Sequence, residues 1–179
     1  ESSPLNPISL YGRTKVEAEK VIMASKNAIG FRLATVFGNS YRMRTDLLVN
    51  NFVYTSIKEK KLIIYEPNFR RNFIHIDDVI DGIIYSIENF NRLKSNVYNL
   101  GLSSANLTKY MLAKKIKKKL KYLKIKIIKN MKDPDQRNYY VSNKKIEKKG
   151  FRAKIRIESG INELISVFNN TRKNIINNY

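Results

Sequence analysis

The sequence of 179 residues contains no cysteine, no tryptophan and only one histidine. Without cysteine the chain cannot form disulfide bonds, use a thiolate nucleophile or offer a cysteine ligand to a metal ion. His75 alone cannot supply a multi-histidine metal site. No apolar run approaches the roughly 18 residues of a membrane-spanning helix, and the first residues lack the basic start and apolar segment of a secretory signal. We therefore expect a soluble, cytoplasmic protein without a metal site.

Acidic residues are also scarce: 15 of them face 35 basic residues, which gives a formal net charge of +20. Such an excess suggests an anionic partner. However, 24 of the basic residues are lysines, and they accompany 21 asparagines and 23 isoleucines, a combination that AT-rich codon usage produces whatever the function. The lysines are also spread over several predicted helices. We therefore expect no nucleic-acid partner, and keep a basic nucleic-acid-binding module as the alternative.

Helical and strand patterns alternate along the chain. Apolar positions three or four residues apart predict helices, and short apolar runs predict strands. Two predicted helices span 9–26 and 46–60. Asp77 caps a third, which has Ile80, Ile83, Ile84 and Ile87 on its apolar face. A fourth carries a stripe of Leu112, Ile116, Leu120 and Leu123, and a fifth carries Ile161, Leu164, Ile165 and Phe168. The predicted strands are 29–36, 61–65, 73–76, 97–100 and 125–128. Strands separated by helices favour an α/β fold with parallel strand pairing.

A candidate active-site motif opens the chain. Tyr11 and Lys15 stand four residues apart at the start of the first predicted helix, so they share one helix face and can approach one ligand. A free phenol has a pKa near 10 and is a poor base at neutral pH, but a nearby ammonium favours its ionised form. The lysine also has three hydrogen-bond donors for ribose hydroxyls. The pair therefore has the chemistry of a general base with a ligand clamp.

The spacing alone is not informative, because the sequence contains it five times. The other four pairs are Tyr54/Lys58, Tyr110/Lys114, Tyr122/Lys126 and Tyr140/Lys144. The first pair differs in its context, since Pro7 and Ser9 precede Tyr11 and Gly12 follows it. We therefore select Tyr11 and Lys15 as the catalytic pair.

Five further segments follow this motif in order, and together with it they resemble one known family. The segments are 31–38 (FRLATVFG), 70–79 (RRNFIHIDDV), 97–101 (VYNLG), 133–137 (DPDQR), and 149–151 with 158–161 (KGF and ESGI). With the lead-in and Tyr11, they resemble the extended short-chain dehydrogenases/reductases, the NAD-dependent epimerase/dehydratase family that modifies nucleotide sugars. The resemblance covers nearly the whole chain.

The resemblance implies an α/β fold made of the C-terminal part of a Rossmann-like parallel sheet plus the smaller α/β substrate-binding lobe. Residues 1–179 would form one partial unit, with the lobe mainly in 39–72 and 102–160. The implied function is an NAD(P)-dependent nucleotide-sugar epimerase or dehydratase, with NAD or NADP as the cofactor. The complete enzyme is expected to be a homodimer.

The resemblance also implies a role for each site residue. Tyr11 and Lys15 would be catalytic and would contact the cofactor, as would Phe37 and Gly38. Thr35 would contact the substrate. Arg71 and Arg137 would bind the substrate's diphosphate, which suits the forked donors of guanidinium groups. Arg42 and Arg44 are weaker candidates for the same phosphates.

The motif of the dinucleotide-binding half is not found in the sequence. Its fingerprint needs closely spaced glycines after a strand, whereas the glycines here stand at 12, 30, 38, 82, 101, 150 and 160. The family's catalytic serine or threonine upstream of the tyrosine is not found either. We therefore expect the C-terminal part of a longer enzyme, inactive alone. A structural remnant that pairs through helices 9–26 and 46–60 is a further alternative.

His75 and the two aspartates after it have plainer interpretations. His75 lies on a short apolar strand, so we expect a hydrogen-bonded core histidine. Asp77 and Asp78 resemble a pair of metal ligands, but we favour one as a helix N-cap and the other as a contact between lobes.

Overall fold

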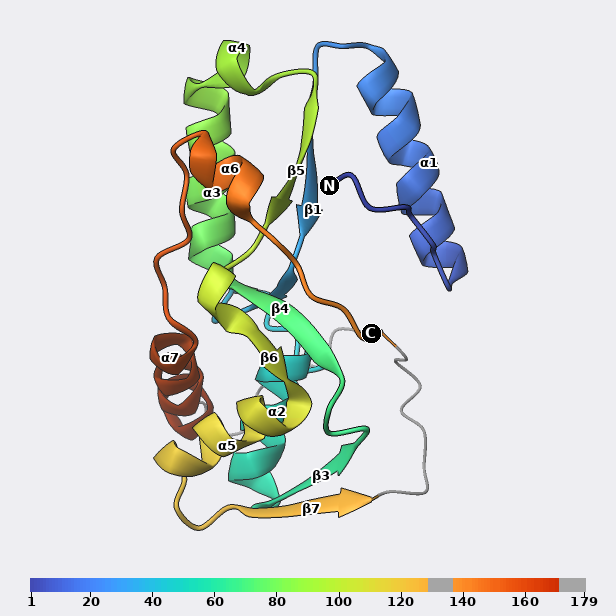
Figure 1. Cartoon of the computed structure of the whole chain (residues 1–179). Helices are drawn as coiled ribbons and strands as arrows, with labels where there is room; N and C mark the ends of the chain where they lie inside the picture. The colour runs from blue at the N-terminus through green and yellow to red at the C-terminus, as the bar shows by residue number, and fades with distance from the viewer. Residues whose placement is uncertain (129–136, 171–179) are drawn as a thin grey trace.

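The computed structural model describes residues 1–128 and 137–170 and has the expected α/β architecture (Figure 1). Its helices are α1 (Leu10–Ala24), α2 (Leu48–Lys58), α3 (Ile76–Glu88), α4 (Phe90–Leu93), α5 (Lys109–Lys119), α6 (Lys144–Lys148) and α7 (Ile157–Asn170), with a 3₁₀ turn η1 (Ser103–Ala105). Its strands are β1 (Ile29–Leu33), β2 (Thr35–Phe37), β3 (Lys61–Tyr65), β4 (Arg70–His75), β5 (Asn96–Leu100), β6 (Asn106–Thr108) and β7 (Lys124–Ile128). None of these helices is long and apolar enough to cross a membrane.

The single strand predicted over 29–36 is wrong, because the structure divides it between two sheets. β1 pairs in parallel with β5, and β2 pairs in parallel with β4. The break falls at Ala34, whose backbone N–H donates to the carbonyl oxygen of Leu100 at 2.9 Å. One nearly continuous segment therefore belongs to both sheets.

The lobe at the lower end of Figure 1 contains a third sheet, of β3 and β7, and β6 extends the sheet of β2 and β4 to three strands. β3, whose predicted bounds are confirmed, pairs in parallel with β7. β4 begins at Arg70, three residues earlier than predicted, and pairs in antiparallel register with β6, a short strand that no pattern predicted. The helices α2, α5 and α7 pack on one another, and their buried side chains include Val49, Val53, Leu112, Ile116, Ile161 and Leu164. This is the larger of the two hydrophobic cores.

The second core lies beneath α3. It consists of Ala34, Ile74, Val79, Leu93, Tyr98, Leu100, Ile146 and Phe151. The helix approaches β5 closely at Gly82, where an added Cβ would lie 3.0 Å from the Cδ2 atom of Leu100. The predicted apolar face of this helix points outward instead: Ile80, Ile83, Ile84 and Ile87 are 44–70% exposed. The periodicity thus predicted the helix but not which side is covered.

His75, not Asp77, caps α3. Its ring Nδ1 accepts the backbone N–H of Asp77 at 3.3 Å, and its Nε2 lies 2.6 Å from a carboxylate oxygen of Glu163 on α7. At 2% exposure it is the expected core histidine. Asp78 is also buried and accepts the backbone N–H groups of Lys154 and Ile155 at 2.8 and 2.9 Å. It therefore makes the kind of contact that we expected of one aspartate, whereas the N-cap prediction for Asp77 is wrong.

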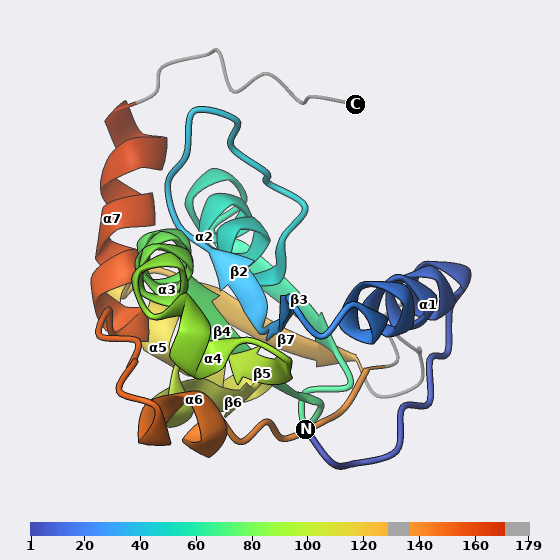
Figure 2. The same cartoon turned by 90° about the horizontal axis from the view of Figure 1, so that it is seen from above.

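The helix that carries the candidate catalytic pair stands to one side of the sheets. Ser9 caps α1, and its Oγ accepts the backbone N–H of Gly12 at 3.1 Å. No residue of α1 is buried. Figure 1 shows the helix next to β1, and Figure 2 shows it on the side away from α3 and α7. The helix therefore lies along the sheet without a packed core of its own.

Candidate active site

Tyr11 and Lys15 lie beside an open groove of about 610 Å³ between α1 and β1. The walls of the groove are mainly apolar, with Leu5, Val16, Ile22, Met23, Phe31 and Leu33 among them. Tyr11 is 70% exposed, so a ligand in the groove can reach its ring and hydroxyl.

The geometry within the pair is not special to this site. Lys15 Nζ lies 5.2 Å from the centroid of the Tyr11 ring. The same arrangement joins Lys58 to Tyr54 at 5.6 Å and Lys114 to Tyr110 at 5.7 Å. The Tyr54 ring, however, packs edge-on against Phe168 at 5.4 Å inside the lobe. The groove beside Tyr11, more than the spacing of the pair, is what makes it a candidate site.

An ion pair joins the two walls of the groove. Nε and Nη2 of Arg32 on β1 lie 2.9 and 2.7 Å from the two carboxylate oxygens of Glu19 on α1. This two-point hydrogen bond lowers the pKa of Glu19 below its ordinary value and raises that of Arg32. Both residues line the groove, so the pair fixes α1 against β1.

The three predicted substrate residues meet in a second cavity. Thr35, Arg71 and Arg137 line a pocket of about 300 Å³ together with Arg44, Asp46, Leu47, Leu48, Asn51 and Lys109. Arg71 is 1% exposed, and its Nη1 donates to the carbonyl oxygen of Arg70 at 3.0 Å. Its guanidinium carbon lies 5.5 Å from the Tyr139 ring centroid. Residues 133–136 of the predicted arginine loop lie outside the described residues.

The pocket is strongly cationic. Among its described lining residues, four are basic and Asp46 is the one acid. Asp46 is already bonded to Arg44, whose Nε lies 3.1 Å from one carboxylate oxygen and whose Nη2 lies 2.5 Å from the other. This contact lowers the pKa of Asp46 below its ordinary value. A small pocket with this charge is suited to an anionic ligand.

Among the basic residues that line this pocket, Lys109 is the one that we did not predict. Among so many lysines, its burial was not visible in the sequence. One signal did exist: Lys109 directly follows Thr108, the N-cap of α5. A cation in the first turn of a helix is placed unfavourably for the helix dipole, so the position suggests another reason for its presence.

Phe37 and Gly38 line neither cavity. Phe37 is 1% exposed, and its ring contacts His75 edge-on at 5.3 Å. Gly38 has a φ of 123°, and its backbone N–H donates to Asn50 Oδ1 at 3.2 Å. Their contact with the cofactor stays a prediction. In the structure Phe37 is the last residue of β2, and Gly38 begins the turn that follows it.

The two cavities adjoin along the backbone. Leu33, the last residue of β1, lines the groove, and Thr35, the first residue of β2, lines the cationic pocket. Ala34 alone separates them in the sequence. The change of sheet at Ala34 therefore places the tyrosine–lysine groove next to the arginine pocket.

Comparison with known proteins identifies the family. Residues 1–101 match the NAD-dependent epimerase/dehydratase family. The chain belongs to this family. It is 30% identical over 172 residues to an uncharacterised protein of Methanocaldococcus jannaschii, covering 90% of this chain and 50% of that protein. It is 27% identical over 168 residues to UDP-glucuronic acid decarboxylase 3 of Arabidopsis thaliana, covering 89% of this chain and 47% of that protein.

Solved structures show the same fold for this member of the epimerase/dehydratase family. A variant of UDP-glucuronic acid 4-epimerase from Bacillus cereus superposes with a TM-score of 0.81 at 19% identity, over 94% of this chain and 55% of that one. The dTDP-glucose 4,6-dehydratase of Bacillus anthracis, in complex with NAD, gives 0.78 at 21% identity, over 96% and 55%. The chain thus spans about half the length of the curated relatives that it matches.

Proposed function

We propose that this chain provides the catalytic base and the substrate-binding lobe of an NAD(P)-dependent nucleotide-sugar epimerase or dehydratase. The observation that supports this most strongly is the junction at Ala34, with the tyrosine–lysine groove on one side and the cationic pocket on the other. A nucleotide sugar lying across the junction would have its sugar beside Tyr11 and its diphosphate beside the arginines. The names of several relatives, which act on UDP sugars, agree with this substrate class.

In this proposal each side chain has a distinct task. Tyr11 Oη accepts a proton from a sugar hydroxyl, and the ammonium of Lys15 stabilises the charge on the phenolate. Arg71 and Arg137 hold the diphosphate through paired hydrogen bonds, which positions the sugar for reaction. Thr35, at the junction, offers a hydroxyl to the sugar.

The residues present fit one end of the cofactor. Tyr11 and Lys15 border a groove with apolar walls, which suits a nicotinamide ring, and Lys15 offers donors to its ribose. The chemistry that NAD(P) supplies when bound is hydride acceptance. The seven glycines are too far apart to form a phosphate-binding loop. We therefore propose that a separate dinucleotide-binding unit completes the site, and that this chain alone is inactive.

We also propose that the complete protein is a homodimer that uses α1. Of the two helices considered for this contact, α2 buries Val49, Phe52 and Val53 in the lobe. By contrast, α1 exposes Leu10 and Val21 by 77% and 74%. Light scattering on the full encoded protein should therefore give twice the monomer mass, and Val21→Glu should reduce it to the monomer. A monomeric wild-type protein would contradict the contact.

The direct test of the function is a product assay. The full encoded protein is incubated with NAD⁺ and, in turn, UDP-glucose, UDP-glucuronic acid and dTDP-glucose, and the products are separated by chromatography and identified by mass spectrometry. Conversion of one sugar nucleotide, with release of no free nucleotide, is the expected result. Failure to convert or bind any of them would contradict the proposal.

A further inference from the structure

Lys109 is the only lysine that the structure of residues 1–128 and 137–170 buries, with 2% exposure. It is the first residue of α5. Its Nζ lies 3.4 Å from the carbonyl oxygen of Tyr65 and 5.5 Å from the centroid of the Phe69 ring. Its backbone N–H donates to the carbonyl oxygen of Phe69 at 3.0 Å. Lys109 is therefore held in place through both its side chain and its backbone.

The position of Lys109 is tied to the strand that carries Arg71. Thr108, the residue before it, is paired with Arg70 in the antiparallel register of β6 and β4. This pairing brings the start of α5 to the pocket, where Lys109 joins Arg71, Arg137 and Thr35 in the lining. The strand β4 and the first turn of α5 thus place cationic side chains in the same cavity.

Three cations in one small pocket suit a ligand that carries more than one negative charge. Each of them can donate a charge-assisted hydrogen bond to a phosphate oxygen. The lysine chain is a compact, strongly charged donor, whereas an arginine offers a planar fork. Lys109 would therefore contribute mainly positive charge to ligand binding, rather than the fixed hydrogen-bond geometry that an arginine provides.

We propose that Lys109 is a third phosphate-binding residue, whose ammonium contacts the diphosphate of the nucleotide together with Arg71 and Arg137. The proposal rests on the proposed function, which places a nucleotide sugar in this pocket. In this proposal Lys109 makes the pocket bind a diphosphate more tightly than a monophosphate, because the second phosphate group carries additional negative charge that a third cation can bind.

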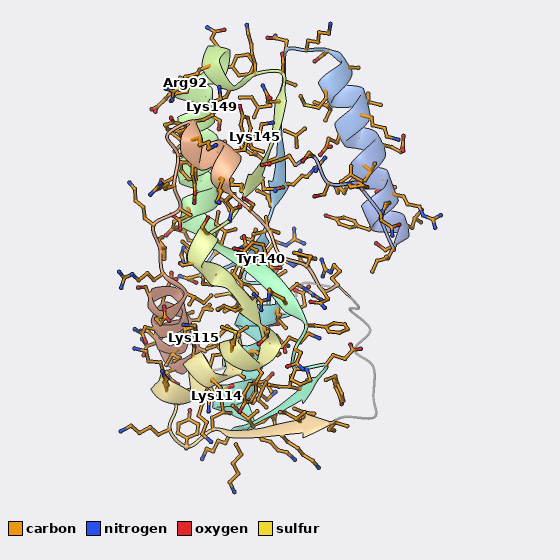
Figure 3. The ribbon with its side chains drawn as sticks, viewed as in Figure 1. Arg92, Lys114, Lys115, Tyr140, Lys145 and Lys149 are labelled. Carbon is orange, nitrogen blue, oxygen red and sulfur yellow. The ribbon has the colours of Figure 1, made fainter. Side chains whose placement is uncertain are left out.

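The test compares Lys109→Met with Lys114→Met in the full encoded protein. Lys114 is a matched control, because it also belongs to α5 and also stands over an aromatic ring, yet it is exposed at the outer end of the lobe (Figure 3). Isothermal titration with UDP, UMP and uridine measures each dissociation constant at two salt concentrations. We expect Lys109→Met to weaken UDP binding about tenfold or more, UMP binding less and uridine binding hardly at all, and Lys109→Arg to recover most of the loss.

Two results would overturn the proposal, and they have different consequences for the proposed function. If Lys109→Met weakens UDP binding no more than Lys114→Met does, Lys109 does not bind phosphate and the proposed function stands. If the wild-type protein binds neither UDP nor dTDP, both proposals fail. Thermal unfolding of each variant checks the fold. If Lys109→Met does not fold, Lys109→Gln, whose amide can still donate to the Tyr65 carbonyl, takes its place with the same expectation.

Discussion

Lys15 Nζ stands 5.2 Å from the ring centroid of Tyr11, one helical turn away on α1. Two other tyrosine–lysine pairs with this spacing adopt the same arrangement. The i to i+4 geometry of a helix is sufficient to produce it, because an exposed ammonium is attracted to the nearest aromatic face. The chemical distinction of Tyr11 must therefore come from what lies beside it, and this can be tested.

In the full encoded protein, Tyr11→Phe should strongly reduce turnover, and Tyr110→Phe is its control. Both changes remove one phenol oxygen from a residue paired with a lysine four positions later. Loss of a general base lowers kcat by about 10²–10⁴-fold, so we expect a loss of that size for the first variant and none for the second. Binding of UDP should be unchanged in both. Equal activity of the two variants would contradict the role of Tyr11.

Arg137→Met should weaken binding of the nucleoside diphosphate. Arg137 is exposed at the pocket, so its replacement should leave the fold intact. Hydrogen bonds to charged groups contribute about 1.5–3 kcal/mol, which corresponds to a rise in Kd of roughly 10- to 100-fold. Titration calorimetry measures the change, and Arg152→Met, an exposed arginine outside the pocket lining, is the control. Similar affinities for the two variants would remove Arg137 from the site.

The ion pair of Glu19 and Arg32 should make the stability depend on acid pH. Because the folded-state pKa of Glu19 lies below its ordinary value of 4.5, ionised Glu19 stabilises the folded chain above that pH. The contribution is lost as the pH falls through the folded-state pKa. Thermal unfolding from pH 7 to pH 3 should show wild type losing its advantage, about 1 kcal/mol, over Glu19→Gln. A difference that does not change with pH would contradict this assignment.

Gly38→Ala should destabilise the protein far more than Gly30→Ala. At position 38 an added Cβ would lie 2.6 Å from Nε2 of the buried His75, and the φ of 123° is unfavourable for any side chain. Strain and overpacking together should cost about 2–4 kcal/mol. At Gly30 the nearest atom is a Val97 methyl at 3.1 Å, which can give way. Denaturant unfolding compares the two, and equal midpoints would contradict the packing described here.

The features that the sequence predicted well are those that depend on local periodicity or on a motif. The bounds of β3 and the buried face of α7, with Ile161 and Leu164, followed from apolar spacing. The meeting of Arg71 with Arg137 followed from the family resemblance, since the two stand far apart in the sequence.

The features that were missed depend on tertiary contacts. The run 29–36 has no polar residue at Ala34 to mark a change of partner strand. The cap of α3 depends on the ring of His75, which is positioned by Glu163 from a distant helix. The burial of Lys109 requires β6 to pair with β4. None of these is encoded in the spacing of neighbouring residues.

The segment that changes sheets at Ala34 also sets the distance between the two cavities. Leu33 and Thr35 are two residues apart, about 7 Å along an extended backbone, and they line different cavities. If a sugar lies at the groove and its diphosphate at the pocket, peptide geometry sets how far apart the two ends are held. Side-chain substitutions would then alter affinity, whereas inserting or deleting one residue at position 34 would change which carbon of the sugar reaches Tyr11.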